Sequence, residues 1–294
     1  MKKLLSLLFA AVLTMAAHAQ FLGWIEVGDY YNPTEIYNGS YFDMAPTNFY
    51  LAHTGVQMIY TPDLLTNMAG KDGVKIKYLN FKFSSESFEA IVRNAKIYLQ
   101  EIDATEFAIN ENGVKQFFTF GDLVAEGRYD IDLLDFYGED QSLVMEIEES
   151  FNFTLGKSLL VTIVFDAEDD DNCTMGRDYA PFYTSGIRGK AMTYTDNWTS
   201  FVDYAMSDQF PDATAMQGCG TNVELPVTEI GYTYERMLGD ANGDANISIA
   251  DVTALINFLL SGDPTGFYEV NADINEDGKT SIADVTSLIS MLLN

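Results

Sequence analysis

The chain has few basic residues, and this shortage excludes several classes of partner. It has 294 residues, with 16 Lys and Arg against 44 Asp and Glu, and its formal net charge is −28. A surface this acidic repels phosphate groups. We therefore expect neither nucleic acid nor an anionic membrane surface as a partner.

Histidine and cysteine are also scarce, which argues against several catalytic and metal sites. The chain has two histidines, and one of them, His18, lies in the N-terminal leader described below. His53 then remains without a second histidine, so a histidine-based triad or a histidine-rich metal site is not expected. The two cysteines, Cys173 and Cys219, lie in turn-rich polar sequence. They either form one disulfide in an oxidising compartment or remain unpaired.

Long apolar runs are absent except at the N-terminus. Lys2 and Lys3 precede the run Leu4–Met15, and Ala17 and Ala19 form a small-residue cleavage site. This pattern predicts a secretory signal peptide over residues 1–19. The run is too short to span a membrane. We expect a mature protein without a membrane span, secreted or associated with the cell surface.

Residues 20–234 have the pattern of an all-β domain. The chain contains 17 Tyr and 20 Phe, and short alternating segments are separated by polar turns. Residues 158–165 form a nearly continuous apolar run, as expected for a central strand. The alternation changes phase near Tyr78, which predicts a β-bulge there. The other predicted strands are residues 74–78, 79–83, 95–99, 143–147, 151–153 and 226–234. The predicted fold is a jelly-roll-type β-sandwich, followed by a linker at residues 235–238.

The end of the chain contains one loop sequence written twice. Residues 240–251 read DANGDANISIAD, and residues 273–284 read DINEDGKTSIAD. We call these segments loop 1 and loop 2. Side-chain oxygens occupy positions 1, 3, 5, 9 and 12 of each, which are the offsets of an EF-hand-type calcium loop. Calcium needs six to eight oxygen ligands, and a twelve-residue loop can supply them. Two copies therefore predict two calcium sites.

An apolar helical pattern follows each loop. Apolar residues recur at the spacing of one helix face, namely Val252, Leu255, Ile256, Leu259 and Leu260 in the first copy, and Val285, Leu288, Ile289, Leu292 and Leu293 in the second. Gly262, Asp263 and Pro264 should end the first helix. Two short helices cannot bury their apolar faces alone, so we expect them to pack against each other.

This tandem loop–helix pattern over residues 239–294 resembles a type I dockerin, a small all-α module that binds cohesin domains of a scaffold. Asp251 and Asp284 agree with the Asp that dockerins have at position 12, and the turn-rich residues 236–239 agree with their missing entering helix. The resemblance implies two sets of Ca²⁺ ligands: Asp240, Asn242, Asp244, Asn246, Ser248 and Asp251, and Asp273, Asn275, Asp277, Lys279, Ser281 and Asp284. Asn246 and Lys279 would contribute only their carbonyls, and the two serines would act through water.

The resemblance also implies a docking surface. In dockerins, cohesin contact falls on loop positions 10 and 11 and about two turns further along the helix. Ile256 and Ile289 also belong to the apolar pattern, so the interior of the module is the alternative place for them. The implied contact residues here are Ile249, Ala250, Ile256, Asn257, Ile282, Ala283, Ile289 and Ser290.

The two loops differ at position 6, where a left-handed backbone favours glycine. Loop 2 has Gly278 and loop 1 has Ala245. We expect about 1 kcal/mol of strain at Ala245, and hence a weaker first site.

The region before the dockerin-like segment resembles the galactose-binding-like sandwich of cleaved-adhesin proteins in gut and oral Bacteroidetes. The resemblance rests on residues 58–62, 76–83, 93–99, 151–161 and 192–196. It implies a binding or adhesive module, with an extracellular glycan as a possible ligand. Trp24 and Trp198 could stack on sugar rings, or they are ordinary core or rim aromatics. The acidic residues 166–172 form either a third calcium site or a solvated loop.

One segment resembles the acidic strand of laminarinase-like glycosidases. Glu101, Asp103 and Glu106 have the spacing of that family's nucleophile, assisting Asp and acid/base, although Ala104 stands where the family has a bulky aliphatic residue. Retaining hydrolysis needs two carboxylates about 5 Å apart. A solvated strand end is the favoured interpretation of this segment.

The sequence as a whole predicts a secreted, non-catalytic binding protein, anchored by a dockerin and used with extracellular polysaccharide. An extracellular glycoside hydrolase and a purely structural surface protein are the alternatives.

Overall fold

The computed structural model describes residues 20–33, 45–46, 52–68, 71–82, 91–131, 142–166, 182–196, 199–205, 218–244 and 246–293. Several predictions lie outside these residues. They are the signal peptide at 1–19, the disulfide at Cys173, sugar stacking by Trp198, backbone strain at Ala245, and all of the acidic segment 166–172 except Asp166.

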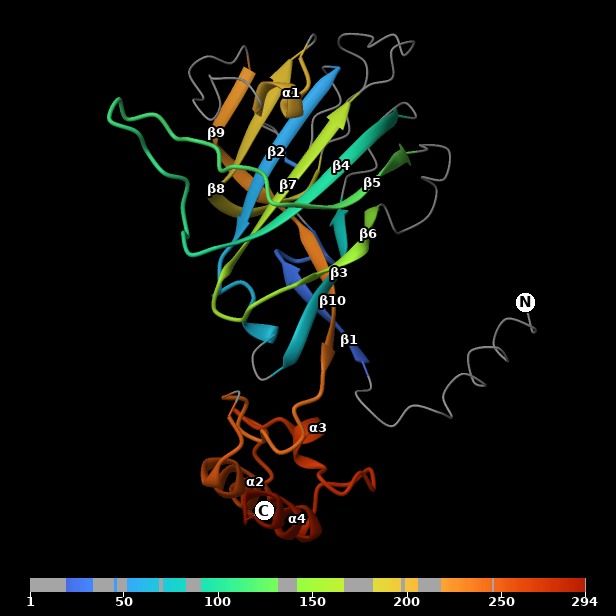
Figure 1. Ribbon diagram of the computed structural model, residues 1–294, viewed down its shortest axis with the longest axis vertical. Coiled ribbons are helices and arrows are strands. Elements are labelled where there is room, and N and C mark those ends of the chain that lie inside the picture. Colours follow the sequence, from blue (N-terminus) through green and yellow to red (C-terminus); the bar gives the residue numbers. More distant parts are fainter. Residues whose placement is uncertain are drawn as a thin grey trace, which may run out of the picture. The chain divides into compact units, whose positions relative to one another are not determined.

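Strands are the commonest element of the described chain and form two antiparallel β-sheets (Figure 1). A four-stranded sheet has the order β1-β10-β3-β6, and a six-stranded sheet has the order β5-β4-β7-β2-β8-β9. The strands are β1 Gln20–Val27, β2 His53–Tyr60, β3 Asp72–Lys82, β4 Ile91–Ile102, β5 Asp122–Ile131, β6 Ser142–Asn152, β7 Ser158–Asp166, β8 Thr184–Asp196, β9 Gly218–Pro226 and β10 Thr228–Glu235. The predicted fold class, mainly β with two packed sheets, is confirmed.

The strand β7 lies inside the six-stranded sheet, as its continuous apolar sequence predicts. It pairs with β2 on one side and with β4 on the other, and residues 158–165 are all buried. One face of this sheet contributes Ile59, Leu160 and Val164 to a core with Phe107, Phe117 and Phe201. Phe201 begins the short helix α1 (Phe201–Ala205). Because both faces of β7 are covered, no polar alternation appears in its sequence.

Other strand predictions hold in part. The register of β3 against β6 shifts between Ile76 and Tyr78, so the predicted bulge is confirmed. The separately predicted strands 143–147 and 151–153 fall in one strand, β6, which ends at Asn152. The predicted last strand, 226–234, covers the end of β9 and most of β10, which meet at Val227. The alternating pattern did not resolve the break because Leu225, Val227 and Ile230 are all buried.

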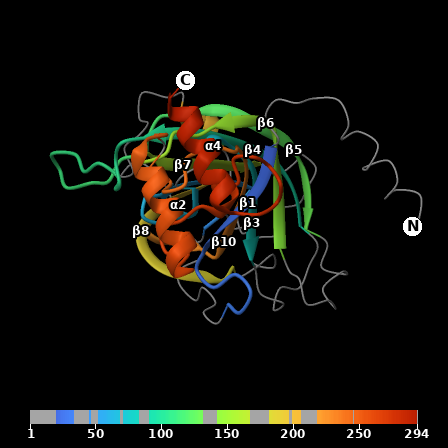
Figure 2. The same cartoon turned by 90° about the horizontal axis from the view of Figure 1, so that it is seen from below.

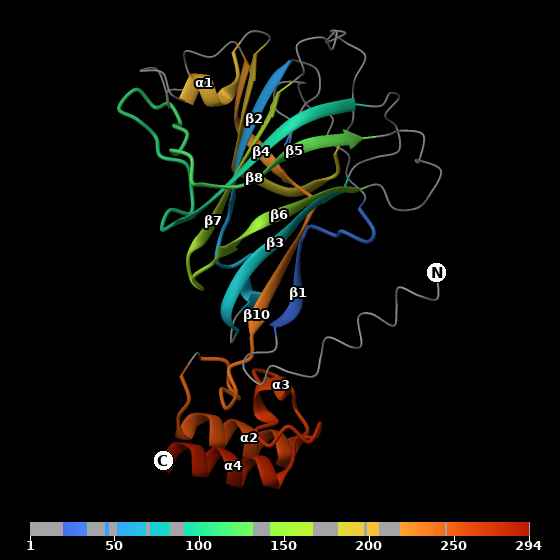
Figure 3. The ribbon, with the colours of Figure 1, turned by 45° about the vertical axis from the view of Figure 1, so that its right-hand side comes forward.

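The chain divides into two compact units. One contains the described residues within 23–68 and 74–232, and the other contains those within 20–22, 71–73 and 233–293. Figure 3 shows the two sheets. The connection between β2 and β3 contains a short 3-10 helix, Thr66–Met68. Among the described residues, no helix is long and apolar enough to cross a membrane.

The C-terminal residues form the helices α2 (Ile249–Ser261), α3 (Glu269–Ala272) and α4 (Ile282–Leu293). The helices α2 and α4 lie side by side (Figures 1 and 2), and Val252, Leu255, Val285 and Leu288 share one core. The predicted packing is thus confirmed. Gly262 ends α2 in a left-handed conformation (φ 70°), as expected.

Candidate functional site

Loop 1 brings three carboxylates together. One oxygen from each of Asp240, Asp244 and Asp251 lies within 4.8 Å of the other two. Asp240 and Asp251 are fully buried. Carboxylates this close repel one another unless a cation or a proton lies between them. The donor set therefore fits a hard cation such as Ca²⁺, which prefers carboxylate oxygens.

The carboxylate at position 12 closes each loop in the same way. Asp251 Oδ1 accepts the Asn242 N–H (3.1 Å) and Oδ2 accepts the Ser248 N–H (2.7 Å). Asp284 accepts the equivalent N–H groups of Asn275 (3.1 Å) and Ser281 (2.8 Å). Each carboxylate thus ties position 3 to position 9 and also lies in the first turn of the following helix.

The two serines at position 9 cap these helices. Ser248 Oγ accepts the Ala250 N–H (3.1 Å), and Asp251 completes a capping box. Ser281 Oγ accepts the Ala283 N–H (3.2 Å). The helix α2 or α4 therefore begins where its loop ends, and the fold of the helix depends on the geometry of the loop.

The protonation of Asp284 is shifted by its surroundings. Burial raises the pKa of this carboxyl group, but backbone N–H donors from Asn275, Ser281 and Ile274, together with the Ser281 hydroxyl, lower it more. The net pKa lies below the ordinary value of 3.8. Asp284 therefore stays ionised, as a calcium ligand must.

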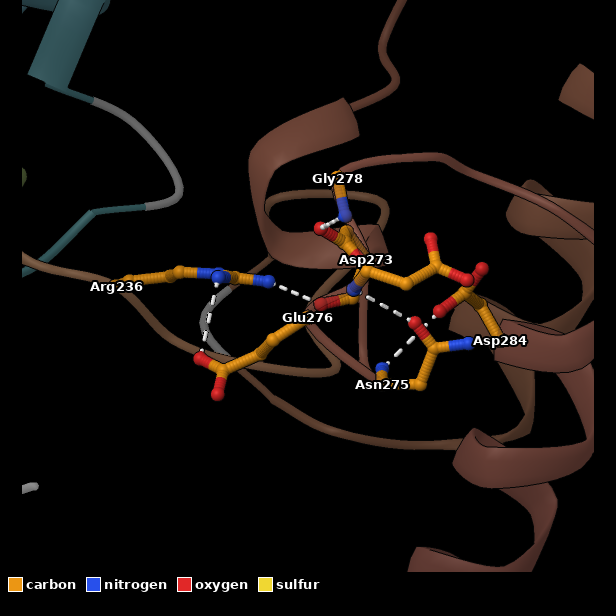
Figure 4. A network of polar contacts seen from close by, with 7 residues as sticks. Arg236, Asp273, Asn275, Glu276, Gly278 and Asp284 are labelled. Atoms are coloured by element: carbon orange, nitrogen blue, oxygen red, sulfur yellow. Dashed lines mark hydrogen bonds and ion pairs between the residues drawn. The ribbon is translucent and has the colours of Figure 1, made fainter.

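Loop 2 repeats most hydrogen bonds of loop 1, but the carboxylate at position 1 accepts the N–H groups of positions 4 and 5 in loop 1 and those of positions 5 and 6 in loop 2. Asp273 accepts N–H groups from Asp277 (3.1 Å) and Gly278 (3.0 Å), as Figure 4 shows for Gly278. The position 3 oxygens, Asn242 Oδ1 and Asn275 Oδ1, each accept the N–H of position 5 at 2.9 Å. Position 5 in turn accepts the N–H of Asn246 or Lys279. Within the described residues, the close group of three carboxylates occurs in loop 1 and not in loop 2.

Position 4 of each loop has a left-handed backbone, which the loop sequences did not predict. Gly243 has φ 73°, Glu276 has φ 59°, and Gly278 at position 6 has φ 80°. Glu276 is the one non-glycine residue of the described chain with positive φ. The glycine at position 4 of loop 1 was the available signal, but the identical offset in loop 2 carries a glutamate.

Arg236 and Asn271 also contact the loops, although neither belongs to the predicted ligand sets. Arg236 donates to the Asp273 carbonyl and lies 3.5 Å from the Glu276 carboxylate (Figure 4). Asn271 donates through Nδ2 to the Asp240 carbonyl (3.0 Å), and its own carbonyl accepts the Gly239 N–H (2.9 Å). Residues that precede each loop therefore hold the first carbonyl of the other loop.

The implied docking residues lie on the surface of the module. Ile249 and Ile282 are 71% and 70% exposed, and Ile256 and Ile289 are 38% and 39% exposed. Ala250, Asn257, Ala283 and Ser290 are exposed as well. The buried pattern is narrower than predicted, because Leu259, Leu260, Leu292 and Leu293 are also exposed. Of the ten residues in the two predicted apolar faces, Val252, Leu255, Val285 and Leu288 are buried, and they share a core with Ala241, Ala272 and Ile274.

The three carboxylates of the glycosidase-like segment take separate partners. Glu101 accepts the Thr154 N–H, Asp103 pairs with Lys157, and Glu106 lies 3.6 Å from Lys190. Glu101 and Asp122 line an open pocket of about 610 Å³, whereas Asp103 and Glu106 do not line it.

His53 has a carboxylate partner that the sequence did not indicate. Its Nδ1 lies 2.8 Å from Asp166 Oδ1, and Ser200 Oγ donates to Asp166 Oδ2 (3.0 Å). The serine therefore contacts the carboxylate and not the imidazole, unlike the nucleophile of a catalytic triad. Trp24 is 42% exposed, and its ring stacks on Tyr78.

Comparison with known proteins identifies the C-terminal segment. Residues 238–293 match the family model described as the dockerin type I domain. No curated protein and no solved structure matches the chain. Dockerin type I domains bind calcium, and a dockerin implies a cohesin partner. The adhesin-like character of the preceding region stays a prediction. The resemblance to a type I dockerin is confirmed, and residues 238–293 form the dockerin domain of this chain.

Proposed function

We propose that this protein is secreted and attaches to a cohesin-bearing scaffold through its dockerin, which folds around two Ca²⁺ ions. The close group of three carboxylates in loop 1 is the observation that carries the proposal, and the similar hydrogen bonds of loop 2 support a second site there. The proposed ligands are the two sets of six residues named above, Asp240 to Asp251 and Asp273 to Asp284.

Calcium ordering and docking are linked through positions 9 and 12 of each loop. When bound, the ion offsets the mutual repulsion of the loop carboxylates. Asp251 and Asp284 then hold the N–H groups that close the loops, and the neighbouring serines start the helices. Ile249 and Ile282 are the first residues of those helices. The docking surface therefore forms only when the loops are closed.

The β-sandwich is proposed to be a non-catalytic binding module for an extracellular ligand. Glu101, Asp103 and Glu106 are engaged by three different partners, which does not support a shared reaction centre. A glycoside hydrolase remains the alternative. Release of reducing sugar from a β-glucan, lost in Glu101→Gln and in Glu106→Gln, would favour that alternative.

Docking is tested by capture of the full chain on cohesin domains encoded in the same genome. We expect capture in calcium and release by a chelator. The variant Ile249→Asp/Ile282→Asp should lose capture, whereas Val144→Asp, an exposed change in β6, should not. Capture that is unaffected by the chelator, or by the double change, would refute calcium-dependent docking.

A further inference from the structure

Three neighbouring strands of the four-stranded sheet present two short rows of side chains on one face. The strands β1, β10 and β3 are adjacent, and alternate residues of a strand share a face. Residues 25, 79 and 230 point into the core, since Ile25, Leu79 and Ile230 are at most 1% exposed. The opposite face carries an aromatic row of Trp24, Gly231 and Tyr78, and a polar row of Glu26, Glu229 and Asn80.

In the aromatic row, the Trp24 ring is partly exposed to solvent. The rings of Trp24 and Tyr78 stack with centroids 5.9 Å apart and an interplanar angle of 25°. Gly231 lies between them, and a Cβ there would come within 2.6 Å of Trp24 and 2.9 Å of Tyr78. The glycine therefore leaves room for both rings. Trp24 nevertheless keeps 42% of its surface exposed.

The polar row has more acceptors than donors. Glu229 is only 9% exposed, and its carboxylate accepts from Tyr31 Oη and Asn80 Nδ2 at 3.4 Å each. Both distances exceed those of ordinary hydrogen bonds. Asn80 Oδ1 is buried with no hydrogen-bond partner in the described part of the chain. Buried acceptors left this way are rare in folded proteins and point to a missing donor.

Glu26 adds a second carboxylate beside Glu229. Burial, and then the charges of Glu229 and Asp29, raise the pKa of Glu26. The two carboxylates are thus close enough to repel each other. An anionic ligand would add to this repulsion, while a neutral ligand with hydroxyl donors would supply what the row lacks.

We propose that this face binds a neutral sugar unit of an extracellular polysaccharide, with its ring on Trp24 and its hydroxyl groups donating to Glu229, Glu26 and Asn80. Residues two positions apart on a strand are separated by about 6.6 Å, so one sugar ring with its hydroxyls reaches both rows. The aromatic row distinguishes a sugar from a bare metal ion, which would need only the oxygens. This inference depends on the proposed role of the sandwich as a binding module, and it is independent of docking.

Affinity gel electrophoresis of the full chain tests the proposal. The gels contain hydroxyethylcellulose, mixed-linkage β-glucan, arabinoxylan, glucomannan or starch, with polygalacturonate as the anionic comparison. We expect retardation by at least one neutral polysaccharide and none by polygalacturonate. Trp24→Ala should weaken binding at least about tenfold, and Glu229→Gln should weaken it as well. Leu123→Ala, which changes a residue of β5 that is 45% exposed, is the matched control.

The proposal is overturned by no retardation by any neutral polysaccharide, by retardation unchanged in Trp24→Ala, or by equal retardation by polygalacturonate. The gels are run with calcium and with a chelator. Retardation that persists in chelator is expected, because the proposed face needs no ion. Retardation abolished by the chelator would instead assign these oxygens to a cation. If the chain does not bind a cohesin but is still retarded by a neutral polysaccharide, the docking proposal fails and the sugar-binding proposal stands.

Discussion

Loop 1 and loop 2 of the dockerin use different residues for the same left-handed turn at position 4. Gly243 adopts it without steric cost, whereas Glu276 adopts it with a side chain and φ 59°. Loop 2 has a partner for that glutamate, because Arg236 contacts both Glu276 and the Asp273 carbonyl. The comparison teaches that the ligand spacing imposes the backbone, and that contacts outside the loop support the copy whose sequence fits it less well.

The largest effects should come from position 12, where the two loops are most alike. We expect Asp251→Asn or Asp284→Asn to lower the calcium affinity of the loop that carries it by about 100-fold or more, since a buried carboxylate ligand loses its charge. Isothermal titration calorimetry of the full chain gives the two affinities. Equal, small losses in both variants would contradict the assignment of these carboxylates as ligands.

Gly243→Ala should destabilise loop 1 strongly. The new Cβ would occupy a left-handed position and lie 2.0 Å from the Tyr268 ring, so the backbone or the ring must move. We expect a loss of about 2–3 kcal/mol in the unfolding free energy of the dockerin. Chemical denaturation in calcium, followed by far-UV circular dichroism, measures it. Gly266→Ala, with positive φ but nothing within 4 Å of the new Cβ, separates backbone strain from the clash.

Arg236→Gln should disturb the structure of loop 2 and leave the structure of loop 1 unchanged. The guanidinium side chain is only 16% exposed and donates to the Asp273 carbonyl. A hydrogen bond from a charged group of this kind contributes about 1.5–3 kcal/mol. Amide chemical shifts of Gly278 and Gly243 in a ¹⁵N-glycine-labelled chain report the two loops separately. An equal disturbance of both loops would show that Arg236 does not act on loop 2 specifically.

Glu276→Gly should stabilise loop 2 by up to about 1 kcal/mol, because glycine relieves the left-handed conformation. The lost ion pair with Arg236 offsets little of this, since Glu276 is 69% exposed. Thermal unfolding in saturating calcium measures the change. A lower melting temperature would mean that the Arg236 contact outweighs the strain.

The smallest expected effect is the loss of stability of loop 2 at low pH. The folded pKa of Asp284 is lower than its ordinary value of 3.8. Its contribution to stability is therefore fully present above that value and is lost as the pH falls through the folded pKa. We expect loop 2 to be as stable at pH 5 as at pH 6 and to become less stable as the pH falls below 3.8. Gly278 amide shifts between pH 6 and 3 check this, and a transition centred above pH 5 would contradict it.

The sequence was most informative where spacing is imposed by chemistry. The loop offsets and the stop at Gly262 were readable because calcium ligation and helix ends need particular residues at particular positions. The continuous run 158–165 identified β7 for a similar reason, since both of its faces are buried. Arg236, Asn271 and the partner of His53 were not predictable, because those contacts join residues brought together only by the tertiary fold. The row of Trp24, Gly231 and Tyr78 likewise depends on the order of β1, β10 and β3.

The most direct test of the account counts the calcium ions bound to each chain by native mass spectrometry. The full chain should hold two ions, Asp251→Asn and Asp284→Asn should each hold one, and a chain ending at Glu235 should hold none. Two ions retained by the shortened chain would contradict the claim that these loops bind the metal.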